Sequence, residues 1–283
     1  MQPFTLKQKQ NIERGEILTN QLVGKVTAAF DKSDALIVPK RHHYIVGPAG
    51  IGKSVTVRNT AKKHRIPLIE IIGVASMNAI AIALALAVHN SRGKKTYVWI
   101  DDCDSVFADR TSLSVMKGAL DEDRNMFAWN KNMTAMIQLY EKSESVHEQR
   151  VAEALRAFQT ADGVGIQIPT DNINFIITSN QSLAPSNPAP KGARKIDESA
   201  IRDRVVYTEF KYDRDVSWGW TASVTMKNKI FDLTKAQKQE LLHWLDHNWD
   251  RLGSVSMRAI KELAAEMINH PSDYPDYWET HLN

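Results

Sequence analysis

The sequence has little cysteine and no long apolar run. Cys103 is the only cysteine among 283 residues, which excludes an intramolecular disulfide and a zinc site built from several cysteines. The most apolar stretch, Ala79–Val88, is shorter than the run of about 20 residues that a membrane-spanning helix needs. Met1–Arg14 is polar and lacks the apolar core of a secretory signal. We therefore expect a soluble, cytoplasmic protein with no membrane partner.

An excess of charge of one sign is also absent. Lys and Arg total 36 and Asp and Glu total 33, a formal net charge of +3. This balance neither requires nor excludes nucleic acid as a partner, because a local basic stripe can lie within a nearly neutral total. Apolar residues make up 43% and charged residues 24%, which excludes a disordered or collagen-like chain. The length allows one large domain or two smaller ones.

Short apolar runs alternate with helical patterns along most of the chain. The runs lie at residues 44–46, 68–72, 96–100 and 173–178, with a weaker one at 205–210. The patterns between them predict helices, for example over Lys53–His64 and Ala79–His89. This alternation is typical of a parallel sheet covered by helices on both faces. From about Thr234 onward the pattern is helical, so the sequence predicts an α/β core followed by a small α-helical lid.

The same patterns predict a domain organisation. Residues 1–40 are expected to be a helical and linker segment, residues 41–230 the α/β core, and residues 231–283 the lid. Residues 121–170 interrupt the core with a charged helical pattern at Ala135–Phe158, and we interpret them as a helical insertion. Residues 182–198 hold three prolines and a basic cluster and are predicted to form an exposed loop.

One segment matches a phosphate-binding motif in full. It follows the first apolar run, precedes a helical pattern, and fits G-x-x-x-x-G-K-[ST]. Its residues are Gly47, Pro48, Ala49, Gly50, Ile51, Gly52, Lys53 and Ser54. Glycines let backbone N–H groups wrap a phosphate, and the helix N-terminus adds positive charge. Lys53 is expected to reach the β- and γ-phosphates of ATP and Ser54 to ligate Mg²⁺. The alternative is a glycine-rich turn that only resembles the motif.

A second motif ends the third apolar run in acid, at Val98–Asp102. Asp101 is expected to hold Mg²⁺ through water, and Asp102 to orient or deprotonate the attacking water. The alternative is the start of a helix, since Asp104 and Ser105 stand where an N-cap would. The position of the acids after the phosphate loop, with one apolar run between, favours the catalytic interpretation.

At this point the chain resembles the AAA+ ATPases. Asn172–Asn180 is similar to the family's sensor 1 strand, which implies that Asn180 helps to hold the nucleophilic water. Ala200–Arg204 resembles the segment that carries the arginine finger, a residue given to the neighbouring subunit's site. Arg204 matches the family position better and Arg202 is second. The alternative for either is a surface ion pair with Asp203 or Glu198.

Gly253–Arg258 resembles sensor 2, which implies that Arg258 reaches the γ-phosphate from the lid. The alternative is a solvated helix arginine. The resemblance covers roughly residues 40–270. The sequences of Trp99–Phe107 and of the C-terminal tail that contains Trp278 most resemble those of small AAA+ ATPases encoded by bacteriophages. For such a protein the expected location is the host cytoplasm.

The chain departs from the family pattern in two places. Most members have Glu where this chain has Asp102. In protein-threading relatives the loop after the second strand carries an aromatic residue, whereas residues 73–78 have neither an aromatic nor a charge. The insertion offers Trp129 among basic residues, a pattern suited to stacking on exposed bases. The alternative is a solvated helix face with a buried tryptophan. The basic residues of this pattern are Arg124, Lys131, Lys142 and Arg150.

The resemblance implies an oligomeric, magnesium-dependent ATPase. We expect a ring or spiral of identical subunits, six by the family pattern, that couples ATP hydrolysis to remodelling or loading in DNA metabolism, with DNA or a replication protein as partner. The alternative is a protein-remodelling chaperone that acts on a protein complex. A third possibility is a nucleotide-gated scaffold with slow turnover, which the aspartate at position 102 favours.

Overall fold

The structure is a computed structural model that describes residues 3–30, 41–73, 75–103, 106–107, 109–183, 194–227, 232–252 and 255–282, with the backbone alone at 194–198. It divides into two compact units. The helical unit comprises Met1–Lys25, Gly47–Thr56 and Phe210–Asn283, and the sheet unit comprises Val26–Val46 and Val57–Glu209. Within the described ranges, no helix has the length and apolar character needed to span a membrane.

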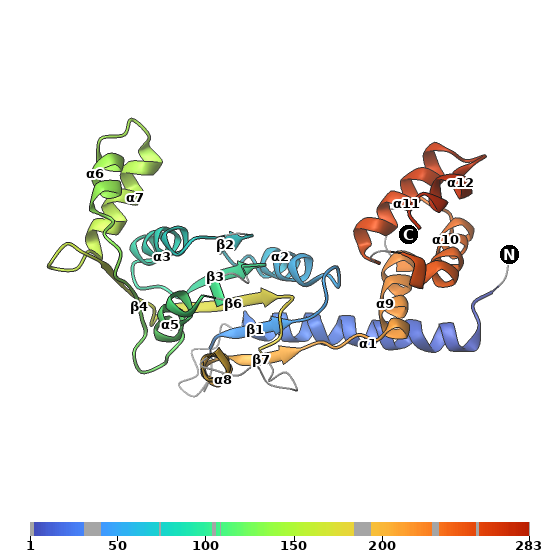
Figure 1. Ribbon diagram of the computed structural model, residues 1–283, viewed down its shortest axis with the longest axis horizontal. Coiled ribbons are helices and arrows are strands. Elements are labelled where there is room, and N and C mark those ends of the chain that lie inside the picture. The colour runs from blue at the N-terminus through green and yellow to red at the C-terminus, as the bar shows by residue number, and fades with distance from the viewer. Residues whose placement is uncertain are drawn as a thin grey trace. The chain divides into compact units, whose positions relative to one another are not determined.

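The sheet unit contains a five-stranded parallel sheet (Figure 1). Its strands stand in the order β2-β3-β6-β1-β7. The strands are β1 (His43–Val46), β2 (Leu68–Ile72), β3 (Thr96–Asp101), β6 (Ile173–Ser179) and β7 (Val206–Glu209). All neighbouring pairs are parallel. Each of the five apolar runs forms one strand, so the predicted parallel α/β core is confirmed.

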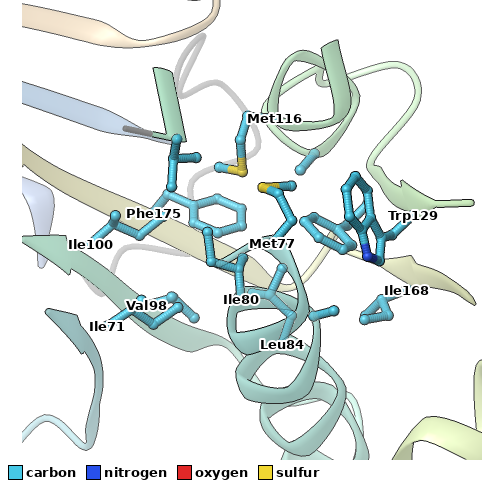
Figure 2. Close-up of a cluster of buried hydrophobic side chains, with 14 of the residues drawn as sticks. Ile71, Met77, Ile80, Leu84, Val98, Ile100, Met116, Trp129, Ile168 and Phe175 are labelled. Carbon is cyan, nitrogen blue, oxygen red and sulfur yellow. The ribbon is translucent and has the colours of Figure 1, made fainter. Parts of the chain in front are cut away.

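Helices cover both faces of this sheet. On one face the buried side chains of α3 (Met77–Ser91) pack with those of the strands, and Figure 2 shows Ile80 and Leu84 beside Val98 and Phe175. Helix α5 (Arg110–Ala119) contributes Met116 to the same cluster. The apolar character of α3 on nearly all sides is that of a helix buried within a protein.

The opposite face meets α2 (Lys53–His64) and the end of α1 (Leu6–Ala29). The guanidinium of Arg58 lies 5.0 Å from the centre of the Trp99 ring. The ring of Phe30 lies 5.3 Å from that of Tyr97. Successive residues of β3, such as Val98 and Trp99, thus face opposite layers, because side chains along a strand alternate with a period of two.

The insertion is an antiparallel hairpin that carries two helices. Strands β4 (Met126–Trp129) and β5 (Ile166–Pro169) pair, and α6 (Thr134–Glu141) and α7 (Val146–Ala157) lie between them in the chain (Figure 1). The helical pattern at Ala135–Phe158 is confirmed, with a break after Glu141. The two strands were not predicted, because they are short and the main pattern of this segment is the helical one at Ala135–Phe158.

Trp129 is not available for stacking on a base. Only 6% of its surface is exposed, and its indole N–H donates to Asn78 Oδ1 at 2.8 Å. It packs with Ile168 and α3 in the cluster of Figure 2. The interpretation of the insertion as a base-stacking platform through Trp129 is therefore wrong, and the alternative of a buried tryptophan is correct.

The helical unit holds the C-terminal helices. They are α9 (Arg214–Lys227), α10 (Lys235–Asn248), the 3₁₀ turn η1 (Trp249–Arg251), α11 (Met257–Asn269) and α12 (Tyr274–Glu279). The helical patterns that begin at residues 235 and 256 are confirmed. Helix α9 was not predicted, and it belongs to this compact unit, whose C-terminal part comprises Phe210–Asn283. The domain limits of the sequence stay a prediction.

The N-terminal helix α1 packs against α9 through two glycines. A Cβ at Gly219 would lie 1.8 Å from the Asn11 carbonyl oxygen, and one at Gly15 would lie 2.3 Å from the Trp220 nitrogen. Only glycine permits two helix backbones to approach so closely. Helix α1 lies in the segment predicted to be helical and linker, residues 1–40, of which residues 31–40 lie outside the described residues.

Candidate active site

The phosphate loop has the backbone conformation that its glycines permit. Gly50 and Gly52 have φ angles of +83° and +84°, values that residues with a side chain rarely adopt. The side chain of Lys53, the first residue of α2, folds back onto this loop. Its ammonium donates to the carbonyl oxygens of Gly47 at 2.7 Å and Pro48 at 3.0 Å, and only 5% of the residue is exposed. The Lys53 ammonium is thus bound by backbone carbonyl oxygens of the phosphate loop itself.

Within the helical unit this loop lies against the start of α11. A Cβ at Gly50 would lie 3.0 Å from the Cβ of Ser256, and one at Gly52 would lie 3.6 Å from the Trp220 ring. Ser256 caps α11 by accepting a hydrogen bond from the Ala259 N–H at 3.3 Å. Arg258 follows on the first turn and is exposed, and within the described ranges its side chain has no hydrogen bond or ion pair. The helix predicted to carry sensor 2 therefore begins beside the phosphate loop.

In the sheet unit, strand register brings the two acids and Asn180, the asparagine predicted as sensor 1, to one edge. Asp101 stands opposite Thr178, and Val46, the residue before the phosphate loop, stands opposite Ser179. Because the strands are parallel, their carboxyl ends meet at the same edge, where α/β proteins bind ligands. Asn180 follows β6 at that edge.

The carboxylate of Asp101 is held by a buried chain of hydrogen bonds. The indole N–H of Trp99 donates to Thr178 Oγ1 at 2.8 Å, and the Thr178 hydroxyl donates to Asp101 Oδ1. Only 3% of Asp101 is exposed. The Trp99 donor occupies one side of the threonine oxygen, so the threonine hydrogen is directed at the carboxylate. Groups of this kind orient a metal ligand from behind.

Asp102 differs from Asp101 in exposure and in backbone. It is exposed, its φ is +52°, and its N–H donates to the Thr178 carbonyl oxygen at 3.1 Å. The side-chain amide of Asn180 donates to Asp102 Oδ1 at 3.0 Å. Residues with short polar side chains such as Asp are several-fold enriched at positive φ. The turn at the end of β3 therefore gives a physical reason for Asp where the family pattern has Glu.

The two candidate finger arginines have different surroundings. Arg204 donates from Nε to Asp121 Oδ2 at 2.9 Å, its Nη2 lies 2.7 Å from the same oxygen, and Nη1 donates to the Ala200 carbonyl at 2.8 Å. The partner is thus Asp121, not the predicted Asp203 or Glu198. Burial raises the pKa of Asp121, but hydrogen bonds from the Arg124 backbone N–H and from Arg204 outweigh it and hold that pKa below its ordinary value.

Arg202 instead stacks on a tyrosine. Its guanidinium lies 4.6 Å from the centre of the Tyr207 ring, and within the described part of the chain it has no hydrogen bond or ion pair. Tyr207 is held by its hydroxyl, which accepts from the Leu183 N–H at 3.2 Å and donates to Glu209 at 3.2 Å. Burial first, and then Glu209, raise the pKa of Tyr207. The Tyr207 ring thus supports the Arg202 guanidinium, while the N–H groups of Arg202 make no hydrogen bond within the described residues.

The residues that could hold Mg²⁺ are few. Over the described ranges no three His, Cys, Asp or Glu side chains cluster as a metal site. Magnesium ordinarily binds proteins through one or two carboxylates or hydroxyls and completes its shell with water and phosphate oxygens. The buried carboxylate of Asp101 fits that donor set, and Ser54 supplies the motif's hydroxyl.

Two residues that position the acids were not predicted. Trp99 and Thr178 lie inside β3 and β6 and read as ordinary strand residues in the sequence. A signal existed in the period of two along each strand, because Trp99 and Asp101 share one face of β3. That face also carries Thr178 of β6, by register.

Comparison with known proteins identifies a family for this chain. The family model described as "ATPase family associated with various cellular activities (AAA)" matches residues 43–199, more than half of the chain. No curated protein matches. The narrower resemblance to phage-encoded members stays a prediction. The matched residues run from the strand before the phosphate loop, through the acids and Asn180, into α8 (Arg194–Arg204), and this chain therefore belongs to the AAA family of ATPases.

Proposed function

We propose that this chain is a magnesium-dependent ATPase that works as a ring or spiral of identical subunits, six by the family pattern, and couples hydrolysis to remodelling or loading in DNA metabolism. The main observation in favour of ATP hydrolysis is the arrangement of two carboxylates and Asn180 at the ends of β3 and β6. One carboxylate there is buried and fixed, and the next is exposed and bonded to Asn180. These are the different environments that a metal ligand and a general base need.

In the proposed reaction, the loop N–H groups and Lys53 bind the phosphates of ATP. The ammonium of Lys53 exchanges the carbonyls of Gly47 and Pro48 for phosphate oxygens. Asp102 takes a proton from water while the water oxygen attacks the γ-phosphorus. The bond from that phosphorus to the bridging oxygen breaks, ADP leaves with the electron pair, and Asn180 orients the water through its amide. Ser54, and Asp101 through water, would hold Mg²⁺, which would supply positive charge to neutralise the phosphates.

The contacts of the two arginines support Arg202 as the finger. A finger must present unbonded N–H groups to the phosphoryl of a neighbouring subunit. Arg202 has such groups, whereas all three donor positions of Arg204 are used by Asp121 and Ala200. In this proposal Arg204 stabilises the subunit, and Arg258 contacts the γ-phosphate from α11.

Mixing inactive variants tests the finger. Subunits with Lys53→Ala and subunits with Arg202→Ala are each expected to be inactive alone and to regain part of the ATPase rate when mixed, since each supplies what the other lacks. The same mixture with Arg204→Ala separates the two candidates. Co-assembly without any recovery for Arg202→Ala, together with recovery for Arg204→Ala, assigns the finger to Arg204.

An exposed apolar pair favours protein as the alternative partner. Leu139 on α6 and Val146 on α7 are 67% and 62% exposed, and a protein partner buries such side chains more readily than DNA does. We test the choice by the ATPase rate with single-stranded DNA, double-stranded DNA or an unfolded protein added. Stimulation by DNA supports DNA metabolism, and stimulation by protein alone supports the remodelling chaperone.

A further inference from the structure

The helical unit contains an aromatic groove apart from the phosphate loop. It has a volume of about 640 Å³ and lies between α10 and α12. Its apolar lining includes Trp244, Tyr274, Pro275 and Trp278. Figure 1 shows the two helices within this unit. Its volume is in the range of binding clefts, which run from about 300 to 1,000 Å³.

The rings of this groove are fixed by packing and hydrogen bonds. The Trp278 ring lies 5.2 Å from that of Trp244 and 4.7 Å from that of Tyr274. The Trp278 indole N–H donates to the Leu263 carbonyl at 2.9 Å, and the Tyr274 hydroxyl donates to Glu240. A groove made of rings held in this way loses little side-chain entropy when it binds a partner.

One donor of the groove is unused. The indole N–H of Trp244 has no hydrogen bond within the described part of the chain. The buried side-chain nitrogen and oxygen atoms that lack a partner do not include this nitrogen, so its N–H is open to solvent. A half-buried tryptophan with a free N–H is suited to bind an apolar group with its ring and a carbonyl oxygen with its nitrogen.

One acid, Glu240, lines the groove, and His243 lines it as well. Helix α12 and its flanks, residues 271–280, carry three further acids near the groove and no Lys or Arg. Those acids are Asp273, Asp276 and Glu279, which do not line the groove. Aromatic-lined grooves with a free donor recognise extended proline-rich segments, and a carboxylate in the lining favours segments that carry a cation.

The chain itself contains a segment of this chemistry. Residues 185–193 read Pro-Ser-Asn-Pro-Ala-Pro-Lys-Gly-Ala, with three prolines, one lysine and no acid. We propose that the groove between α10 and α12 binds residues 185–193 of a neighbouring copy of this chain. The prolines pack on Trp244 and Tyr274, the Trp244 N–H donates to a peptide carbonyl, and Lys191 pairs with Glu240. The contact is independent of nucleotide chemistry and links one subunit to the next.

Binding of a synthetic peptide tests the groove. A fluorescently labelled peptide of residues 184–194 is titrated with the full-length protein without nucleotide, and its anisotropy is followed. Trp244→Ala is expected to weaken binding about tenfold or more, as loss of a buried aromatic anchor does. Trp244→Phe keeps a ring and removes the N–H, and Glu240→Gln removes the charge, so both are expected to weaken it less. Tyr277→Ala is the matched control, because Tyr277 is on α12 but does not line the groove.

Further controls separate this contact from nonspecific attraction. A peptide with its three prolines replaced by alanine keeps the lysine and is expected to bind at least tenfold more weakly. Equal binding of that peptide, equal binding to the Trp244→Ala protein, or no binding at millimolar concentration overturns the proposal. Thermal unfolding of each variant checks that the fold is retained, and Trp244→Phe keeps the test decisive if Trp244→Ala does not fold.

Assembly decides whether the bound segment belongs to a second copy. Full-length protein with Pro188→Ala, Pro190→Ala and Lys191→Gln is compared with Trp244→Ala by sedimentation velocity over a range of concentrations. Both are expected to shift the protein to smaller species, and combining them is expected to add nothing further. Unchanged assembly in both, with peptide binding intact, overturns the placement in a second copy and points to another proline-rich partner. An ATPase assay on the same samples reports separately on the proposed catalytic function.

Discussion

The sheet unit and the helical unit contribute to the proposed site in different ways. In the sheet unit, strand register and the Trp99–Thr178–Asp101 hydrogen bonds set the positions of the candidate catalytic side chains at the ends of β3 and β6. In the helical unit, Gly50 and Gly52 set the backbone shape of the phosphate loop through positive φ. Side-chain substitutions are therefore expected to separate binding from hydrolysis in the sheet unit. In the helical unit, side-chain atoms added at its tightly packed glycines are expected to damage the fold.

The largest expected effect is on the exposed acid. Asp102→Asn keeps a residue that tolerates positive φ and removes the proton acceptor, so we expect hydrolysis to fall by about 10²- to 10⁴-fold with ATP binding unchanged. Turnover is measured by phosphate release and binding by a fluorescent ATP analogue. Hydrolysis near the wild-type rate in this variant would show that Asp102 is not the base.

The next effect concerns the glycine contact of α1 with α9. Gly219→Ala places a methyl group 1.8 Å from a backbone oxygen that has no side-chain freedom to move. We expect a loss of about 3 kcal/mol or more in the free energy of unfolding, at the upper end of overpacking effects. Tryptophan fluorescence during urea unfolding measures it, because five of the seven tryptophans lie in residues 210–283.

Gly24→Ala is the matched control for that substitution. Gly24 is in α1, and a Cβ there meets no atom within 4 Å. Because alanine is the better helix former, we expect this variant to gain about 0.5–1 kcal/mol. An equal loss in both variants would show that the helix crossing is not as tight as described.

A smaller effect is expected from the hydroxyl behind Asp101. Thr178→Val keeps the shape of the side chain and removes the donor, so the carboxylate loses the group that orients it. We expect the Mg²⁺ concentration for half-maximal ATPase activity to rise by about 10- to 100-fold, as for other groups behind metal ligands. Thr178→Ser keeps the hydroxyl and is expected to stay close to wild type. Identical magnesium dependence in all three proteins would contradict the positioning role.

The smallest expected effect is on pH-dependent stability. His42 is fully buried and accepts a hydrogen bond from the Phe175 N–H at 3.2 Å. Burial, then the charge of Arg41, lowers the pKa of His42 to about 3. Below its ordinary pKa of about 6.5 the unfolded chain takes up a proton that the folded chain does not, so stability falls as the pH drops from about 6.5 toward 3.

At pH 5 this difference is about 2 kcal/mol relative to neutral pH, from about 1.4 kcal/mol per pH unit. Urea unfolding at pH 7 and pH 5 is expected to show a smaller pH difference in His42→Gln than in wild type. His147→Gln, which changes an exposed histidine on α7, is the control and is expected to match wild type. The same pH difference in all three proteins would exclude His42 as the cause.

Much of the fold could be predicted because its signals are local. The five apolar runs become strands, and the helices at residues 53, 235 and 256 follow from pattern and capping. Helix α9 and the strands β4 and β5 could not be predicted. Strands β4 and β5 lie in a segment whose main pattern is helical, and the buried residues of α9, from Val216 to Thr225, lie on all of its sides. The candidate residues were identified from motifs. The residues that hold them in place, Trp99, Thr178 and Asp121, have no role in those motifs and could not be identified in this way.

The sequence by itself determined the family and the phosphate-loop motif, and it predicted the order of the candidate acids, sensors and arginines, because the spacing of these motifs is a property of the chain. Only the tertiary structure decided that Trp129 is buried, that Arg204 is bonded to Asp121 while Arg202 is not, and that Asp102 has a left-handed backbone. The physical reason is that burial and hydrogen bonding join residues far apart in the chain. Asp121 and Arg204, brought together by packing, are such a pair.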